Sequence, residues 1–426
     1  MKLHGSLNIK NDELCVGNIT LSSIAREFGT PYFLMDENLI RENINKFKNS
    51  MGEQNKVVYA GKTFLNSHMI KILIDENIFL DVVSDGELFV AKNSGFNMEN
   101  IIFHGNNKSY DEIKMGIEFS VGRFVVDSLD ELNMISKISK ELNKKTKVFL
   151  RINPGIEAHT HEYIKTACVD CKFGIFNDKN QILNIVNSYR ENKNIDIVGF
   201  HCHIGSQIFS NEPYIYEIDE LFKLMSFLNE KINFTTYELN LGGGFGIYYT
   251  FGDRPLTIEE QIKFMLMRVS QNCENLNLNM PKIYVEPGRS IVGNAGTTVY
   301  EVGTVKEIQG VRNYVSVNGG MSDNIRTALY DAKYECSLVN RFGNENYKAT
   351  ITGKLCESGD ILIKDVLIRK PERGDLLAIF STGAYCHSMS SNYNKLRRPP
   401  VIFFYNDNLK LSSRRETLLD LIKLDV

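Results

Sequence analysis

A single lysine follows a run of β-branched and small residues at positions 57–63, with the sequence VVYAGKT. The run predicts a buried strand that ends in a tight turn, which places Lys62 at the carboxyl end of that strand. A lysine held there and partly desolvated can lose its proton and attack an aldehyde as an amine nucleophile. The Gly-Lys-Thr triplet is not a phosphate loop, because that motif needs a glycine five residues before Gly61 and the chain has Lys56 there. A solvated lysine just past a strand is the alternative interpretation.

Three consecutive glycines, Gly242, Gly243 and Gly244, also follow a predicted strand. The backbone N–H groups of such a run can approach a phosphate closely. The run does not spell the dinucleotide fingerprint, because Ile247 and Tyr249 occupy the positions at which that motif needs its last glycine. A tightly packed turn is the alternative, but a place at the end of the seventh strand favours phosphate binding.

Glu286, Pro287, Gly288 and Arg289 end the eighth predicted strand. A carboxylate held there could bond a protonated heteroaromatic nitrogen, and the arginine fork could bind a phosphate or a carboxylate. Taken alone, the tetrapeptide is also compatible with an ion-paired turn.

Two histidines end the sixth predicted strand. Strand alternation sends His201 and His203 to the same face, so one of them could lie flat over a planar cofactor while Ser206 offers a hydroxyl to a phosphate. The alternative is a zinc site. Its further ligand types would come from His159, His161, Cys168 and Cys171. The Cys-x-x-Cys pair lacks a second pair at zinc-finger spacing.

The second half of the chain holds further polar candidates. A thiol beside acidic residues is usually a small buried apolar group, but an exposed Cys356 could donate a proton to a carbanion. Glu357 could bind an ammonium group. Arg326 and Tyr330, four residues apart on one helical face, could join Tyr385 in recognising a carboxylate and a phosphate.

From about residue 57 onward, short apolar runs alternate with segments of helical period. Eight such units over roughly 230 residues match a TIM barrel better than an open doubly wound sheet. The predicted strands are residues 57–60, 80–84, 101–104, 124–127, 148–152, 198–203, 237–241 and 283–286. The predicted helices include residues 67–77, 85–94, 109–119, 128–143, 212–231 and 258–274. A barrel places its chemistry at the carboxyl ends of these strands.

After Pro287 the pattern changes to short strand-like runs with turn residues between them, which predicts a β-rich second domain. These runs are residues 297–302, 314–317, 349–352, 360–366, 376–380 and 401–405. The first 35 residues are too short to fold alone and are expected to join it. We therefore predict a barrel domain at residues 36–287 and a β-rich domain formed by residues 1–35 and 288–426.

Composition excludes several classes of protein. The chain has 426 residues, 43% of them hydrophobic, and a formal net charge of -3, so it can bury two cores and carries no polyanion-binding charge. We expect no nucleic-acid partner. Its 8 cysteines are too sparse for a disulfide framework and indicate a reducing cytoplasm. Because no apolar leader or membrane-length segment is present, we expect a soluble, cytoplasmic protein without a membrane partner.

Taken together and in order, these motifs resemble one family, the fold-type III pyridoxal-phosphate decarboxylases. The likeness rests on the lysine after strand one, HIGS after strand six, GGG after strand seven, EPGR after strand eight and then CESGD. It covers nearly the whole chain, including residues 103–108 (FHGNNK), 157–161 (EAHTH) and 392–394 (NYN). Within the family, the pattern is most similar to members that convert meso-2,6-diaminopimelate to L-lysine and carbon dioxide, the last step of one route of lysine biosynthesis.

The resemblance implies roles for the cofactor residues. Lys62 would bond the aldehyde carbon of pyridoxal 5'-phosphate, His203 would stack on its ring, and Glu286 would keep the pyridine nitrogen protonated. The residues that bind the phosphate or lie beside it would be Ser206, Gly242, Gly243, Gly244, Pro287, Gly288, Arg289 and Tyr385.

The resemblance also implies a substrate site and an assembly. The distal amino acid group of the substrate would meet Arg289, Arg326, Tyr330, Glu357 and Tyr385. Cys356 would reprotonate Cα and would reach the site from the neighbouring subunit, so the active enzyme is expected to be a homodimer.

The chain departs from the family pattern at a few positions. Thr327 stands where proline is usual, Thr63 follows the lysine where alanine is common, and Cys386 and His387 replace the more usual residues after Gly-Ala-Tyr. These changes concern backbone stiffness near the substrate and leave every proposed functional side chain in place.

Three alternative functions stay open on the sequence. A sister decarboxylase would act on ornithine, arginine or carboxynorspermidine, whose distal ends would not need Arg326 and Glu357 to bind a complete amino acid head. A metal-dependent barrel hydrolase would use the His-x-His pairs. A catalytically inactive, partner-binding homologue would have lost the cofactor, but the retained lysine and cysteine argue against it.

Overall fold

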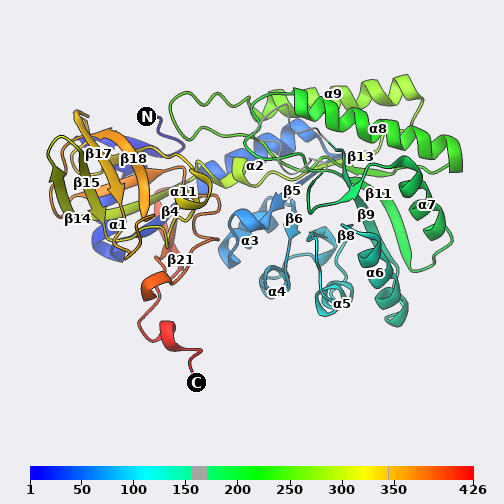
Figure 1. Ribbon diagram of the computed structural model, residues 1–426, viewed down its shortest axis with the longest axis horizontal. Helices are drawn as coiled ribbons and strands as arrows, with labels where there is room; N and C mark the ends of the chain where they lie inside the picture. Colours follow the sequence, from blue (N-terminus) through cyan, green and yellow to red (C-terminus); the bar gives the residue numbers. More distant parts are fainter. Residues whose placement is uncertain (156–169, 344) are drawn as a thin grey trace. The chain divides into compact units, whose positions relative to one another are not determined.

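The structure is a computed structural model that describes residues 1–155, 170–343 and 345–426 (Figure 1). It divides into two compact units. The barrel unit consists of Ile44–Gly246 and Pro255–Gly288, and the β-rich unit consists of Met1–Asn43, Ile247–Arg254 and Arg289–Val426.

Eight parallel strands close the barrel unit into a TIM barrel, as the sequence predicts. They are β5 (Lys56–Ala60), β6 (Phe79–Val82), β7 (Ile101–Phe103), β8 (Arg123–Val126), β9 (Thr146–Asn153), β11 (Ile195–His201), β12 (Glu238–Asn240) and β13 (Lys282–Val285). Each strand pairs with the next, and β13 pairs with β5 to close the ring. A short β10 (Ile175–Phe176) adds to β9. All eight predicted strands are confirmed, although β6 ends at Val82 and β11 ends at His201, each two residues earlier than predicted.

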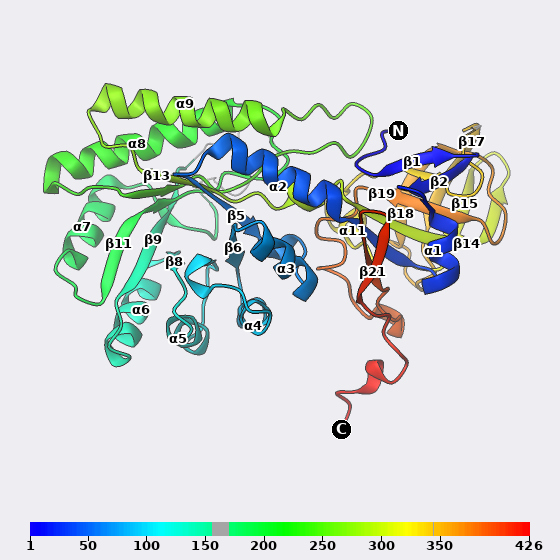
Figure 2. The same ribbon diagram turned by 180° about the vertical axis from the view of Figure 1, so that it is seen from behind.

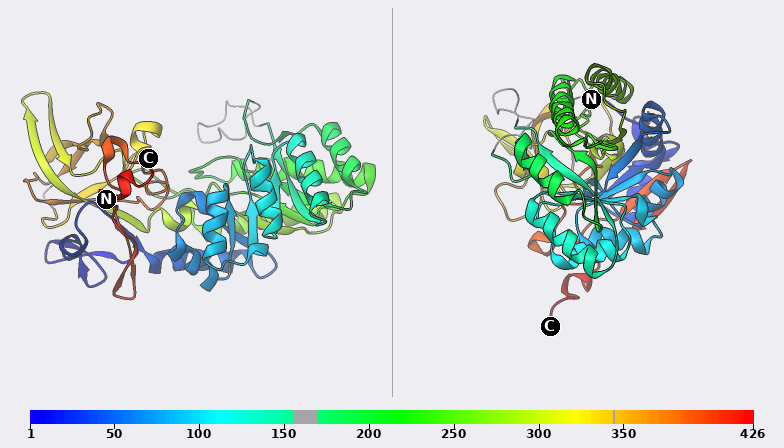
Figure 3. Two further views of the ribbon diagram at one scale, coloured as in Figure 1. Left: turned by 90° about the horizontal axis from the view of Figure 1, so that it is seen from below. Right: turned by 90° about the vertical axis from the view of Figure 1, so that its right-hand side faces the viewer.

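Helices surround the barrel strands, as the right-hand view in Figure 3 shows. They are α3 (Ser67–Asp75), α4 (Asp85–Asn93), α5 (Tyr110–Glu118), α6 (Leu129–Glu141), α7 (Lys179–Tyr189), α8 (Glu212–Ile232) and α9 (Ile258–Leu276). Side chains that follow the strands begin several of these helices. The hydroxyl of Ser84 accepts the backbone N–H of Glu87, and Ser109 forms a capping box with Glu112. These caps tie the starts of α4 and α5 to the rim where the strands end.

Apolar residues from several barrel strands pack together. Val58, Ile102, Phe149 and Tyr284 pack in one buried cluster. This core keeps the strand ends in a constant geometry, as the layered interior of such barrels does. The polar side chains of the rim therefore stand on a rigid support.

The β-rich unit contains two sheets. The first is formed by β1 (Leu7–Lys10), β2 (Glu13–Val16) and β3 (Ile19–Thr20). The second has the order β18-β17-β15-β14-β4-β20-β21, and β19 pairs with both β14 and β16. Its strands are β4 (Tyr32–Asp36), β14 (Gly296–Ile308), β15 (Arg312–Val317), β16 (Cys336–Leu338), β17 (Tyr347–Thr352), β18 (Ile361–Ile368), β19 (Leu376–Phe380), β20 (Val401–Tyr405) and β21 (Asn408–Ser413).

The two ends of the chain meet in the β-rich unit. β4 pairs antiparallel with β14 and parallel with β20, so a strand from the first 36 residues lies inside a sheet built from the last 130 or so. Figure 2 shows these blue and red segments in the same unit. The helices α1 (Leu21–Phe28), α10 (Arg289–Val292) and α11 (Arg326–Tyr330) belong here, and α2 (Glu37–Met51) leads from β4 into the barrel unit. The predicted β-rich second domain is thus confirmed.

Within the described ranges, no helix combines the length and the apolar character that crossing a lipid bilayer would require.

Candidate functional site

The predicted site residues fall into two groups, one in each unit. The barrel group lies at the carboxyl ends of the barrel strands and contains Lys62, His203, Ser206, Gly242, Gly243, Gly244, Glu286, Pro287 and Gly288. The group in the β-rich unit contains Arg289, Arg326, Tyr330, Cys356, Glu357 and Tyr385.

Glu286 is the best-supported side chain of the barrel group. It follows β13, is buried, and accepts the side-chain amide of Asn240 on Oε1 at 2.7 Å. Nε2 of His104 lies 2.8 Å from Oε1, and Nε2 of His201 lies 3.1 Å from Oε2. Three side chains from three other strands thus converge on one carboxylate.

The surroundings of Glu286 favour its ionised form. Burial opposes ionisation, but the imidazoles of His104 and His201 outweigh it and hold the pKa of Glu286 well below its usual range. Burial also lowers the pKa of His201 to about 4, so this ring is neutral near pH 7. Because an ionised carboxylate only accepts hydrogen bonds, neutral His201 donates its Nε2 proton to Glu286. The barrel thus presents a fixed negative charge at its rim.

Lys62 lies in a 3-10 turn, Gly61–Thr63, directly after β5. Its side chain is exposed, so the predicted partial desolvation is not seen. Its positive charge nevertheless acts on Asp81. Burial raises the pKa of Asp81, and the charges of His104 and Lys62 lower it; burial is the larger effect, so the pKa is raised overall. The same charge opposes the burial that raises the pKa of Glu87 to about 7.

The glycine loop is a close-packed turn whose shape depends on the absence of side chains. A Cβ on Gly243 would lie 2.3 Å from the carbonyl oxygen of Glu286, and Gly242 has a φ of +60°. The N–H of Gly242 donates to the Asn240 side chain at 2.9 Å, and the N–H of Gly243 donates to Nδ1 of His203 at 3.2 Å. Among the described hydrogen bonds none uses the N–H of Gly244, so this is the loop amide that remains for an anion.

His203 is neutral in this setting. Burial, followed by the positive charges of Lys62 and Arg151, lowers its pKa well below the usual range. A neutral ring can accept the Gly243 N–H on Nδ1 and still present a flat face to a ligand. Ser206 lies further along the same loop, half-buried.

The barrel group fits a phosphorylated heteroaromatic aldehyde such as pyridoxal phosphate. Asp81 is buried with both carboxylate oxygens lacking a hydrogen-bond partner among the described residues, as expected of a site prepared for a further polar group. The glycine loop offers the N–H of Gly244, which no described hydrogen bond uses, to a phosphate; Glu286 matches a ring N–H, and Lys62 supplies an amine. These donor and acceptor types match that cofactor's own groups.

We expect the mutation Gly243→Ala to weaken cofactor binding by about tenfold or more, because the new Cβ must displace the Glu286 carbonyl and with it the carboxylate. Titration of the apoprotein with pyridoxal phosphate, followed by absorbance, measures this. The matched control is Gly86→Ala in α4, whose Cβ would meet only the Ser84 hydroxyl at 3.8 Å. Equal affinity in the two variants would contradict the close-packed interpretation of the loop.

The residues that could hold a metal ion in the structure differ from those that the sequence suggested. Within the described ranges, the ligand atoms of His104, His201 and Glu286 lie within 4.8 Å of one another, and His203 is not part of this group. His159, His161 and Cys168 lie outside the described residues. Since Asn240 and His201 already satisfy the carboxylate, we interpret the group as a hydrogen-bonded support for Glu286.

An arginine–tyrosine cluster forms in the β-rich unit from Arg289, Arg326, Tyr249, Tyr330 and Tyr385. The guanidinium carbons of Arg289 and Arg326 each lie 4.9 Å from the centre of the Tyr385 ring. Arg289 also donates to the Tyr249 hydroxyl at 2.7 Å, and Arg326 lies 5.2 Å from the Tyr330 ring. Two guanidinium groups over one ring suit a phosphate or carboxylate ligand.

Cys356 and Glu357 lie elsewhere in the β-rich unit, on the exposed loop before β18. No hydrogen bond, ion pair or ring contact in the described part of the chain joins either side chain to the arginine–tyrosine cluster. The exposure of Cys356 distinguishes it from Cys386, which is fully buried and whose pKa burial raises to about 11. Only the first of these two thiols can meet a substrate.

The departures from the family pattern have structural partners. The hydroxyl of Thr327 donates to the Ile361 carbonyl at 2.8 Å, which restrains α11 where proline would have stiffened it. Cys386 packs beside the Tyr334 hydroxyl, and the His387 ring meets Phe33 edge-on at 5.5 Å. They therefore act as packing residues.

Asp81, His104 and Asn240 carry no role in the predicted site, yet they lie at its centre. Asp81 is the one polar residue of β6, Asn240 ends β12 after Glu238 and Leu239, and His104 directly follows β7. A polar residue at the carboxyl end of a barrel strand was the available signal, since functional side chains of such barrels gather at those ends.

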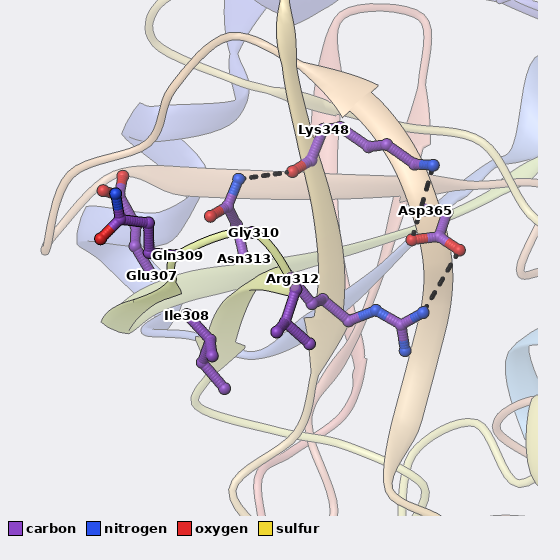
Figure 4. Close-up of a pocket in the computed structure, with 9 residues that line it drawn as sticks. Glu307, Ile308, Gln309, Gly310, Arg312, Asn313, Lys348 and Asp365 are labelled. Atoms are coloured by element: carbon purple, nitrogen blue, oxygen red, sulfur yellow. Dashed lines mark hydrogen bonds and ion pairs between the residues drawn. The ribbon is translucent and has the colours of Figure 1, made fainter.

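A surface hollow of about 600 Å³ lies beside the β14–β15 hairpin (Figure 4). Arg312 and Lys348 both pair there with Asp365, at 3.5 and 4.0 Å. None of the predicted site residues lines the hollow, so it is separate from both groups.

The chain is similar to known proteins over its full length. Residues 37–293 match the family described as pyridoxal-dependent decarboxylase, pyridoxal binding domain. The chain is 44% identical over 431 residues to a diaminopimelate decarboxylase of Bacillus subtilis (strain 168), covering 100% of this chain and 98% of that protein. It is 45% identical over 418 residues to that of Staphylococcus aureus (strain COL), covering 97% of each. A crystal structure of diaminopimelate decarboxylase from M. jannaschii in co-complex with L-lysine superposes with a TM-score of 0.93 at 34% identity, covering 99% of this chain and 98% of that one.

Proposed function

The chain belongs to the pyridoxal-dependent decarboxylases and, within them, to the diaminopimelate decarboxylases, and from this premise we propose how its own residues release carbon dioxide from meso-2,6-diaminopimelate. The product is L-lysine, and the reaction is the last step of lysine biosynthesis by way of diaminopimelate. The enzyme is a carboxy-lyase that depends on pyridoxal 5'-phosphate. When bound, this cofactor supplies an electron sink for the electron pair that remains on Cα after carbon dioxide departs.

The buried carboxylate Glu286 carries the proposal. Held ionised by His104, His201 and Asn240, it would pair with the ring nitrogen of the cofactor and keep that nitrogen protonated. Lys62 would hold the cofactor through its ε-nitrogen, and His203 would support one face of the ring. The barrel group would thus bind and orient the cofactor.

The remaining polar groups are assigned to the phosphate and the substrate. Gly244, with Ser206, would bind the phosphate from the barrel side, and Arg289 with Tyr385 would add charge and a hydroxyl. Arg326, Tyr330 and Glu357 would recognise the distal carboxylate and ammonium of the substrate, which are opposite in charge and so need partners of opposite charge.

A substrate comparison tests this assignment. The purified protein should absorb in the visible range after incubation with pyridoxal phosphate and should release carbon dioxide from meso-diaminopimelate. Release from ornithine or arginine should be at least about a hundredfold slower, because those substrates lack the distal carboxylate that Arg326 would pair with. Activity on a diamine precursor alone would refute the substrate, and stoichiometric zinc in a colourless protein would favour the hydrolase.

We expect Cys356→Ala to lower kcat by about 10²–10³-fold while cofactor absorbance is unchanged, because a general acid contributes about that much and this exposed thiol is assigned no part in binding the cofactor. Cys356→Ser provides the matched control, since it keeps the size but replaces the thiol with a far weaker acid. Full activity in both variants would assign the proton donor to another group.

We further propose that the active form is a cytoplasmic homodimer in which Cys356 serves the site of the partner. Mixing inactive Lys62→Ala and Cys356→Ala chains tests this. If each site takes these residues from different subunits, random reassociation should restore about a quarter of the sites. Recovery near zero would mean that both residues act within one chain.

A further inference from the structure

Asn394 has no role in the function proposed above, although it belongs to the NYN motif of residues 392–394. Its side-chain Oδ1 accepts the backbone N–H of Cys356 at 2.8 Å. Its own backbone has φ 50° and ψ 27°, in the left-handed region, and Lys395 follows with φ 55°. Two successive left-handed residues, one of them a lysine, are unfavourable unless the surroundings impose them.

The Cys356 end of this hydrogen bond is anchored by a buried carboxylate. Oδ2 of Asp360 accepts the N–H of Leu355, the residue just before the cysteine, at 2.8 Å. Oδ1 of Asp360 accepts the N–H of Met321 at 2.6 Å. Asp360 is only 3% exposed, so the loop is tied to the interior directly beside the thiol.

The Asn394 end is anchored to the same place. The N–H of Ser391 donates to the carbonyl of Ser322 at 2.9 Å, and the Asn392 amide donates to the Leu396 carbonyl at 2.9 Å. Because Ser322 adjoins Met321, the hydrogen bonds form a closed circuit through residues 321–322, 355–360 and 391–394. Asn394 to Cys356 is the link that completes it.

We infer that Asn394 is a positioning residue for Cys356, holding the backbone N–H of the cysteine so that its thiol keeps one direction. This inference rests on the proposed function, in which Cys356 donates a proton. A cysteine side chain has a single rotatable bond before its sulfur, so the backbone decides where the thiol can lie. The Cys356 N–H is exposed and water could satisfy it, so orientation rather than stability is what the asparagine contributes.

The decisive variant is Asn394→Gly, which accepts the left-handed backbone and removes the side-chain carboxamide together with its acceptor oxygen. We expect kcat to fall by about tenfold to a hundredfold, with KM changed by less than about twofold, because a misplaced proton donor affects the chemical step. The solvent deuterium isotope effect on kcat should increase, since proton delivery becomes slower. Asn394→Asp, which restores the acceptor and tolerates the same backbone, should recover kcat to within about threefold of wild type.

Lys395→Gly is the matched control. Glycine adopts the left-handed backbone of residue 395 without strain, and the change leaves the hydrogen bond between Cys356 and Asn394 in place, so kcat should be unchanged. Wild-type kcat and isotope effect in Asn394→Gly would overturn the inference. Equal loss in the Gly and Asp variants would also overturn it, since the acceptor would then be irrelevant. The proposed function fails separately, if the wild-type protein releases no carbon dioxide from meso-diaminopimelate or if Cys356→Ala is fully active.

Discussion

Replacing Lys62 by alanine should reduce decarboxylation by at least about 10³-fold, because the amine that would hold the cofactor is lost and no other side chain at that strand end can replace it. Lys62 follows β5 in the turn Gly61–Thr63, and its charge acts on Asp81 and Glu87. Borohydride reduction followed by mass spectrometry of peptides measures the attachment directly. A pyridoxyl group should appear on Lys62 in the wild-type protein and on no residue in the variant.

Two further variants separate the amine from its charge and from general damage. Lys62→Arg keeps a positive charge but cannot lose its proton near pH 7, so it should be as inactive as the alanine variant. Lys56→Ala removes a lysine from the other end of the same strand and should be fully active. Because Lys62 is exposed, its truncation should change stability by less than about 0.5 kcal/mol. Substantial turnover in Lys62→Arg would show that charge, rather than the nucleophile, is what the site uses.

The second large effect is expected for Glu286→Gln, which should lower kcat/KM by about 10²–10³-fold through loss of the negative charge opposite the cofactor's ring nitrogen. The glutamine keeps the shape but turns an amide NH₂ toward donors, since Asn240 and neutral His201 both donate to this side chain. The absorbance of the bound cofactor measures the change independently of activity. Its maximum and its pH dependence should shift when the ring nitrogen is no longer held protonated.

The pH behaviour of the wild-type carboxylate follows from its surroundings. The imidazoles of His104 and His201 hold the pKa of Glu286 below its unfolded value, so its ionisation stabilises the folded protein above the ordinary glutamate range. This contribution is lost only as the pH falls through the lowered pKa. His201→Phe should move that loss to higher pH by removing one hydrogen-bond donor to Glu286, with cofactor absorbance as the readout. If the absorbance of the bound cofactor falls at the same low pH in the variant as in the wild-type protein, His201 does not support the carboxylate.

Local patterns in the sequence determined the elements of this protein. Apolar runs of strand length alternate with helical segments that begin at Ser or Asp, and both signals act over a few residues, so all eight barrel strands could be predicted to within three residues at each end. The order of the motifs likewise indicated which strand ends carry Lys62, the glycine loop and Glu286. These features need no knowledge of which strands are neighbours.

Tertiary structure alone decided what surrounds those side chains. His104, His201 and Asn240 come from three strands and meet at Glu286 only because β13 closes the ring against β5 and pairs with β12, and no local pattern records that closure. The convergence of Arg289 and Arg326 on Tyr385 and the hydrogen bond from Cys356 to Asn394 likewise join residues tens of positions apart. The exposure of Lys62 differs from the prediction for the same reason, since burial depends on what the folded chain places around a residue and not on its neighbours in sequence.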